Sequence, residues 1–177
     1  MELAEKGEFQ PKNTAQAEKE MYSKKADNSK GYTIVADTKG SLLWKHDSEY
    51  DKPHILLTSK QVSKEYLAYL DEKNISYIVT GDNRIDLASA CETLKEVFGI
   101  ERLGIVGGAT INTAFLDAGL LDEVIVLIGA GIDGRASFPP VFNRKDNGQN
   151  DPTPLTLLEA KPYTSGAVFI RYKINKA

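Results

Sequence analysis

Two glycine-rich stretches could bind the phosphates of a nucleotide. In the first, "GAGIDG", Gly129, Gly131 and Gly134 have the G-x-G-x-x-G spacing that is found in dinucleotide-binding folds. That motif works only where a helix begins at the glycines, because the N–H groups and the positive dipole end of the helix hold the pyrophosphate. Here Pro139 and Pro140 lie where the helix would run, so we expect a strand followed by a glycine-rich surface loop.

The second stretch, "LGIVGGATINTAFLDAG", has the context that phosphate binding needs. Residues 103–106 are typical of a short buried strand, Gly107 and Gly108 make a turn, and an apolar stripe predicts a helix of about nine residues after them. Thr110 is the expected N-cap, and Gly119 the expected residue just beyond the helix. Glycines let a phosphate approach the backbone, and a helix start offers unpaired donors. The residues alone leave phosphate binding and a ligand-free turn equally open.

The composition limits the classes of function. The chain has 177 residues, 41% of them hydrophobic and 27% charged, which is enough for one sizeable core. A formal net charge of −3 gives no electrostatic footprint for nucleic acid or for an anionic membrane surface. The single cysteine, Cys91, excludes an internal disulfide and a cysteine-rich metal site. Without a membrane-spanning run or a signal-peptide core, the expected location is cytoplasmic.

Strands and helices alternate along most of the chain. Short apolar, β-branched runs predict strands at residues 32–37, 54–59, 76–81, 102–108 and 122–129. Helical periodicity predicts helices within residues 62–74 and 87–98. This order favours a mostly parallel sheet with helices on its faces.

The two ends of the chain differ from this pattern. Residues 154–163 and 166–174 are predicted strands separated by "TSG", which indicates a C-terminal antiparallel hairpin. Residues 1–30 are polar and charged, so we expect a helix and a connection there. The predicted organisation is therefore this N-terminal segment followed by a single α/β domain at residues 31–177.

Several further residues could do chemistry but have more common structural roles. Asp37 follows the first predicted strand, where an aspartate usually forms a turn or a cap. His46 and His54 flank a polar loop without metal-ligand spacing, so we expect both on the surface. Trp44 could cover a pocket, but packing beneath a loop is the more common case. Lys60, after two hydroxyl residues at a strand end, suits a phosphomonoester, although those hydroxyls could instead cap the next helix.

The segment "IVGGATINTAFLDAGLLDEVIVLIGAGIDG" resembles the signature of the riboflavin-biosynthesis (RibD) C-terminal reductase domain family, whose fold resembles dihydrofolate reductase. In that family a strand, a Gly-Gly-(Gly/Ala)-Thr turn and a helix precede an "AGL-(V/L)-DE" segment, a hydrophobic strand and a glycine-rich loop. The segments "LLTSKQVSKEYLAYL" and "GAVFIRYKI" fit the same pattern in order, so the resemblance covers about residues 31–174. It implies an α/β fold of the dihydrofolate reductase type, a three-layer sandwich with helices on both faces of the sheet.

The resemblance also implies a function and a set of site residues. It implies NADPH as cofactor and hydride transfer to a small heterocyclic or carbonyl substrate. The implied cofactor-binding residues are Gly107, Gly108, Ala109 and Thr110 at the pyrophosphate, Thr58, Ser59 and Lys60 near the adenosine 2′-phosphate, and Gly81 and Asp82 near the adenine ribose. The implied substrate-side loop contains Gly129, Gly131, Ile132 and Gly134. Asp133 in that loop is the candidate catalytic acid, although an aspartate there is more often a turn former. Related domains form dimers, so we expect a homodimer.

Two departures from the family pattern bear on function. Pathway members usually have a glutamate immediately before the glycine pair, where this chain has Val106, so we expect a substrate other than the pathway pyrimidine. The family's first strand with its "SLDGK/R"-like turn and its "GR-x-T" turn are missing, so we expect an N-terminally truncated fragment or a misassigned start. The alternatives to a reductase are a non-catalytic nucleotide-binding protein and an interaction domain whose glycines only shape a turn.

Overall fold

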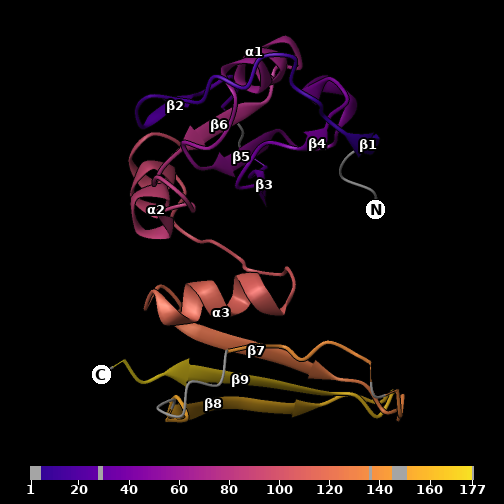
Figure 1. Cartoon of the computed structure of the whole chain (residues 1–177). Helices are drawn as coiled ribbons and strands as arrows, with labels where there is room; N and C mark the ends of the chain where they lie inside the picture. Colours follow the sequence, from indigo (N-terminus) through magenta and orange to yellow (C-terminus); the bar gives the residue numbers. More distant parts are fainter. Residues whose placement is uncertain (1–4, 28–29, 136, 145–150, 177) are drawn as a thin grey trace. The chain divides into compact units, whose positions relative to one another are not determined.

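The computed structural model describes residues 5–27, 30–135, 137–144 and 151–176. The chain forms two compact units, Met1–Leu103 and Gly104–Ala177, each described by itself (Figure 1). The expectation of a single domain at residues 31–177 stays a prediction. None of the helices in the described part of the chain is long and apolar enough to cross a membrane.

The first unit is built on a four-stranded sheet of order β2-β6-β5-β3. Three of its strands, β3 (Thr33–Ala36), β5 (His54–Thr58) and β6 (Ser76–Val79), are parallel, as the sequence predicts. The fourth strand, β2 (Met21–Ser23), runs antiparallel beside β6. The carboxyl ends of β5 and β6 therefore meet at one edge of the sheet, which is where α/β sheets bind ligands.

The prediction of a helix within residues 1–30 is wrong for the described residues 5–27, which contain two short strands and no helix. Here β1 (Glu5–Glu8) pairs with β4 (Leu42–Leu43), and β2 extends the main sheet. Between them Ala17 is buried, and its N–H donates to the carbonyl of Val62. A short polar helix is marginal by itself, whereas a sheet edge satisfies the backbone of an extended segment.

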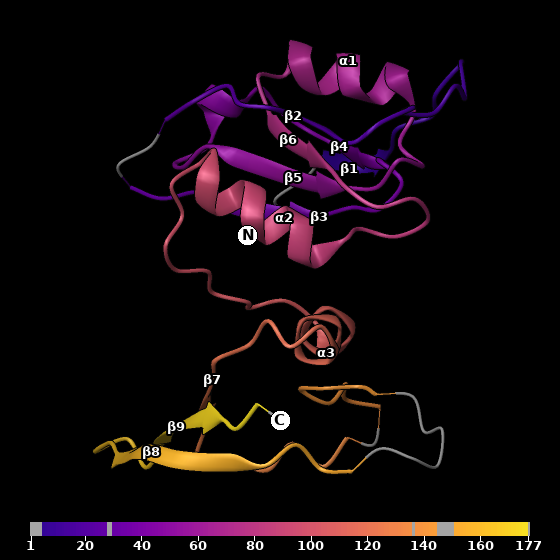
Figure 2. The ribbon, with the colours of Figure 1, turned by 90° about the vertical axis from the view of Figure 1, so that its left-hand side faces the viewer.

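Helices cover both faces of this sheet, as expected (Figure 2). The helix α1 (Lys64–Glu72) packs on one face and α2 (Leu87–Glu96) on the other. Successive strand residues point to opposite faces, so each face has its own core. The strand residues on the α1 side are Leu56, Tyr77 and Val79, and those on the α2 side are Ile55, Leu57 and Ile78. Both helices begin at a capping side chain, Ser63 for α1 and Asp86 for α2, which accepts hydrogen bonds from first-turn amides.

The second unit places α3 (Ala109–Asp117) over a three-stranded antiparallel sheet of order β7-β9-β8. The strands are β7 (Glu123–Ile128), β8 (Leu155–Pro162) and β9 (Val168–Ile174). The predicted hairpin is confirmed, because β8 and β9 are adjacent and the N–H of Tyr163 donates to the carbonyl of Ala167.

Two details of this unit differ from the sequence prediction. The strand expected at residues 102–108 is absent: residues 101–106 have no regular structure, and Val106 is 98% exposed. A strand needs a neighbour to satisfy its backbone, and none of the described strands pairs with this segment. The strand β7, expected in the parallel sheet, instead pairs antiparallel with β9, which offers six matched residues.

Candidate functional site

Five of the predicted cofactor residues lie together at the carboxyl edge of the first sheet. Thr58 ends β5, and its carbonyl accepts from the N–H of Thr80 at 3.0 Å. The N–H of Lys60 donates to the carbonyl of Gly81 at 2.9 Å. These backbone bonds join the two strand ends, so the loop with Thr58, Ser59 and Lys60 lies beside the loop with Gly81 and Asp82.

The hydroxyls of Thr58 and Ser59 are used inside the protein. Both side chains are buried, and both hydroxyls donate to the carbonyl of Thr38, at 3.1 and 2.8 Å. The Ser59 hydroxyl also accepts from the N–H of Gln61 at 3.2 Å. The helix that follows is capped by Ser63 instead. Thr58 and Ser59 therefore fix the shape of the loop that presents Lys60.

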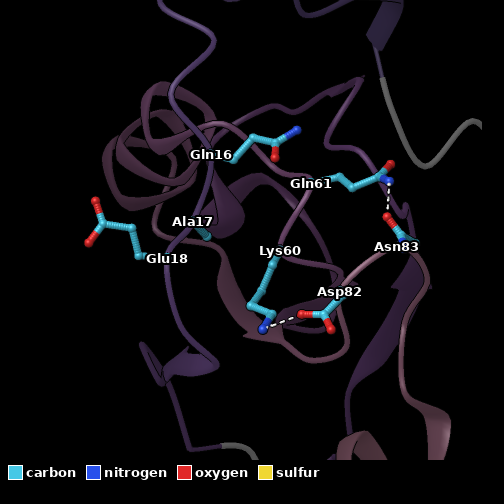
Figure 3. A pocket seen from close by; sticks show the side chains of 7 residues that line it. All are labelled: Gln16, Ala17, Glu18, Lys60, Gln61, Asp82 and Asn83. Carbon is cyan, nitrogen blue, oxygen red and sulfur yellow. Dashed lines mark hydrogen bonds and ion pairs between the residues drawn. The ribbon is translucent and has the colours of Figure 1, made fainter.

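Lys60 faces an open, polar hollow that is drawn in Figure 3. The hollow is lined by Gln16, Ala17, Glu18, Lys60, Gln61, Asp82 and Asn83. In it the ammonium of Lys60 forms an ion pair with the carboxylate of Asp82, and the amide of Gln61 donates to Asn83 at 3.1 Å. The hydrogen bond with Asp82 raises the pKa of Lys60, so this side chain is a cation at neutral pH.

The N-terminal segment forms the opposite wall of the hollow, through Gln16, Ala17 and Glu18. The Glu20 carboxylate accepts from the N–H of Gly81 at 2.9 Å, across 61 positions of the chain. Glu18 forms an ion pair with Lys64 at 2.5 Å, which lowers the pKa of the Glu18 carboxyl. No local pattern marks these glutamates, because their partners are brought close only by the fold.

Gly81 is required by the backbone itself. Its φ is +75°, a conformation that side chains disfavour. A Cβ at this position would lie 2.2 Å from the carbonyl oxygen of Arg84, so the turn has no space for one. The glycine therefore has a structural role whether or not a ribose lies beside it.

The predicted pyrophosphate residues Gly107, Gly108, Ala109 and Thr110 form the turn before α3 and its first residues. The N-cap is Gly108 and not Thr110, which is the second residue of the helix. Among the described residues no side chain caps this helix, and no heavy atom lies within 4 Å of the place where a Gly108 Cβ would be. An uncapped helix start with free space beside it fits an anionic ligand, because its first amides point outward and its dipole attracts negative charge.

The loop after β7 contains the predicted substrate-side residues Gly129, Gly131, Ile132 and Gly134. Residues 129–135 form no helix, so the predicted strand followed by a glycine-rich loop is confirmed. Asp133 forms two hydrogen bonds of 2.5 Å with Arg135, and these lower the pKa of its carboxyl. An ionised carboxylate accepts a proton, so Asp133 as it stands is poorly suited to act as an acid.

The remaining candidates have structural roles. Asp37 forms the expected turn, because its carboxylate accepts from the N–H groups of Gly40, Ser41 and Leu42. His46 caps a short helical turn on the surface. The prediction of a surface position is wrong for His54, which is 2% exposed and 3.2 Å from the Asp47 carboxylate. Its place at the start of β5 in the central sheet explains this burial. The described residues hold no group of three or more metal-ligating side chains.

The class of protein is defined by solved structures with the same fold. This chain is similar to a pyrimidine reductase-like protein of Corynebacterium diphtheriae, with a TM-score of 0.62 and 20% identity, over 81% of this chain and 61% of that one. It is also similar to RibD of Acinetobacter baumannii, with a TM-score of 0.53 and 18% identity, over 70% of this chain and 38% of that one. The predicted fold class, α/β of the dihydrofolate reductase type, is confirmed.

The sequence identifies the family within that class. A sequence profile of the RibD C-terminal domain matches residues 8–169, and the chain belongs to this family. A curated relative, the 2,5-diamino-6-ribosylamino-4(3H)-pyrimidinone 5′-phosphate reductase of Methanothermobacter thermautotrophicus, is 38% identical over 84 residues. Those residues are 48% of this chain and 38% of the relative. The chain thus spans less than two thirds of the length of these relatives.

Proposed function

We propose that this protein is an NADPH-dependent reductase that transfers a hydride to a small heterocyclic or carbonyl substrate. The observation that carries the proposal is the family match over residues 8–169, joined to an uncapped helix start at Gly108 of the kind that binds phosphates. The curated relative is named as a reductase, which supports the same chemistry. The cofactor, when bound, would supply the hydride.

In this proposal the protein's own residues bind and orient. Gly107, Gly108, Ala109 and Thr110 hold the pyrophosphate through backbone N–H groups, because the glycines leave space and the helix dipole favours negative charge. Lys60 contacts the adenosine 2′-phosphate from a loop that the hydroxyls of Thr58 and Ser59 keep in place. Gly81 and Asp82 lie near the adenine ribose.

The substrate is proposed to differ from that of the curated relative. Val106 precedes the glycine pair and is exposed, yet its side chain has no group that could hydrogen-bond a ribityl or ribose hydroxyl. The loop with Gly129, Gly131, Ile132 and Gly134 is proposed to border substrate and nicotinamide. Asp133 would act there as an orienting hydrogen-bond acceptor, and as the catalytic acid once Arg135 has moved away.

NADPH is expected to bind more tightly than NADH, because only NADPH has a 2′-phosphate for Lys60. Charge-assisted hydrogen bonds are stronger than neutral ones, although exposure to solvent weakens them at this site. Lys60→Ala should therefore lower NADPH affinity about tenfold and leave NADH affinity unchanged. Titrations of both nucleotides, followed by nicotinamide fluorescence, measure this.

Lys95→Ala is the matched control, since it removes one positive charge from an exposed position on α2. Equal affinity of the parent chain for NADPH and NADH would contradict the assignment of the 2′-phosphate to Lys60. Binding of NADPH without oxidation in the presence of carbonyl and heterocyclic substrates would favour the alternative, a non-catalytic nucleotide-binding protein.

We also propose that the protein is a homodimer that uses its C-terminal sheet. On β7 the side chains of Ile125 and Leu127 are 60% and 64% exposed, and on β8 Leu157 is 55% exposed. Ile125 and Leu127 lie on the same face of β7, and exposed apolar side chains that share a face mark interaction surfaces, while sheet edges can pair with a second chain.

Light scattering at high micromolar concentration should give twice the 19.5 kDa mass of the chain. Leu127→Lys should shift the mass toward that of the monomer, because it would bury a charge in the interface. Ile132→Lys is the control: this residue is fully exposed in the loop after β7, outside the sheet. A monomeric parent would contradict the proposal.

A further inference from the structure

Two donors at the edge of the first sheet are already occupied by carboxylates of the chain. The ammonium of Lys60 pairs with Asp82, and the N–H of Gly81 donates to Glu20 at 2.9 Å. These are the groups that an anionic ligand entering the hollow would use. In this structure the chain's own anions hold them.

Charges of both signs line the hollow. Among its lining residues Glu18 and Asp82 are negative and Lys60 is positive, while Lys19 and Lys64 lie close to Glu18. Lys64 is itself held by Glu18 from the side of the N-terminal segment. Lys60 is thus the cation that faces the hollow, and it reaches a ligand only by changing partners.

The ion pair of Lys60 and Asp82 can break without disturbing the loop that carries Lys60. The Lys60 side chain is 28% exposed, whereas that of Asp82 is 77% exposed. Asp82 can therefore turn into solvent at little cost, while the buried hydroxyls of Thr58 and Ser59 keep the backbone at Lys60 fixed. Exposed ion pairs contribute little to stability, so a doubly charged phosphate can replace the carboxylate.

We infer that Asp82 competes with the adenosine 2′-phosphate for Lys60 and so limits the preference of this protein for NADPH over NADH, an inference that rests on the proposed function. NADH has no 2′-phosphate, so it leaves the pair of Lys60 and Asp82 intact. NADPH must break that pair before Lys60 can contact its 2′-phosphate. Asp82 is therefore a residue that sets cofactor specificity.

The test is a comparison of NADPH and NADH dissociation constants for the parent, Asp82→Asn, Lys60→Ala and the double variant. Asp82→Asn should raise the preference for NADPH over NADH, expressed as the ratio of the two dissociation constants, about threefold to fivefold, the upper range for losing an exposed ion pair. In the Lys60→Ala background, Asp82→Asn should have little effect on the ratio. This non-additivity would show that the carboxylate acts through Lys60.

Asp51→Asn is the matched control, because it makes the same change in net charge at an exposed position before β5, at the opposite end of the strand from Lys60. An unchanged ratio in Asp82→Asn would overturn the inference but leave the proposed function intact. An equal gain in the preference for NADPH from Asp51→Asn, or from Asp82→Asn in the Lys60→Ala background, would also overturn the inference. The gain would then come from the change in net charge and not from the release of Lys60. Weaker NADPH binding by Asp82→Asn would instead make Asp82 a ligand contact. A parent chain that binds neither nucleotide would reject the proposed function together with the inference.

Discussion

Gly108→Val is expected to abolish the stabilisation that NADPH gives to the parent protein while leaving the fold intact. At a concentration of about 100 times its dissociation constant, a ligand stabilises the native state by roughly 2.7 kcal/mol. The branched side chain would occupy the space beside the start of α3, where the pyrophosphate is proposed to meet the backbone amides. Thermal unfolding with and without NADPH measures the loss.

The fold should tolerate this change. No described heavy atom lies within 4 Å of a Cβ built on Gly108, so the side chain has space. Replacing a glycine N-cap by valine costs only about 1 kcal/mol. The melting temperature without ligand should therefore fall by a few degrees, and the circular dichroism spectrum should stay that of the parent.

Gly131→Val is the matched control. It places the same side chain in the other glycine-rich stretch, and a Cβ there would also meet no described atom within 4 Å. This loop begins no helix, so it has no dipole or free first turn to offer to a pyrophosphate. The variant should keep the NADPH-induced shift. The assignment of the pyrophosphate fails if Gly131→Val removes the shift and Gly108→Val retains it.

The elements that the sequence predicts well are those whose signals are local. The parallel strands β3, β5 and β6 are short apolar runs between turn residues, and their burial on both faces leaves little ambiguity. The helix α3 ends where Gly119 adopts a φ of +68°, as the glycine signal indicates. Periodicity, caps and turn glycines act over a few residues, so a single sequence contains them.

The elements that the sequence predicts poorly depend on a partner strand that is distant in the chain. Residues 102–108 have the composition of a strand, but a strand forms only beside another strand. The polar segment with β2 becomes extended because the edge of β6 is available to it. Pairing of this kind is absent from the local pattern.

The same distinction separates the two halves of the candidate site. The turn at Gly108 could be placed from its neighbours alone, except for the N-cap. The hollow at Lys60 could not, because Glu20 reaches Gly81 from a segment with no sequence signal for it. The hydroxyl of Ser59, which looks available to a phosphate in the sequence, is used by the carbonyl of Thr38.

Trp44→Ala is expected to destabilise the first unit by about 3–5 kcal/mol, the range for removing a large buried aromatic side chain. Trp44 has no exposed surface and belongs to the core on the α1 side of the sheet. Its indole N–H donates to the Tyr66 hydroxyl at 3.0 Å, and its backbone N–H donates to the Tyr69 hydroxyl at 2.6 Å. The residue therefore joins the segment after β4 to two side chains of α1. Urea unfolding followed by circular dichroism measures the loss.

Conservative variants separate packing from hydrogen bonding in this cluster. Trp44→Phe keeps most of the ring volume and should cost less than Trp44→Ala. Tyr66→Phe keeps the ring but leaves the Trp44 indole N–H and the carbonyl of Leu42 without their partner, at about 1–3 kcal/mol for each buried group. Phe138→Ala, at a 61% exposed aromatic residue, should change the free energy of unfolding by less than about 0.5 kcal/mol. If Trp44→Ala cost no more than Phe138→Ala, Trp44 would be a cover over a pocket and not part of the core.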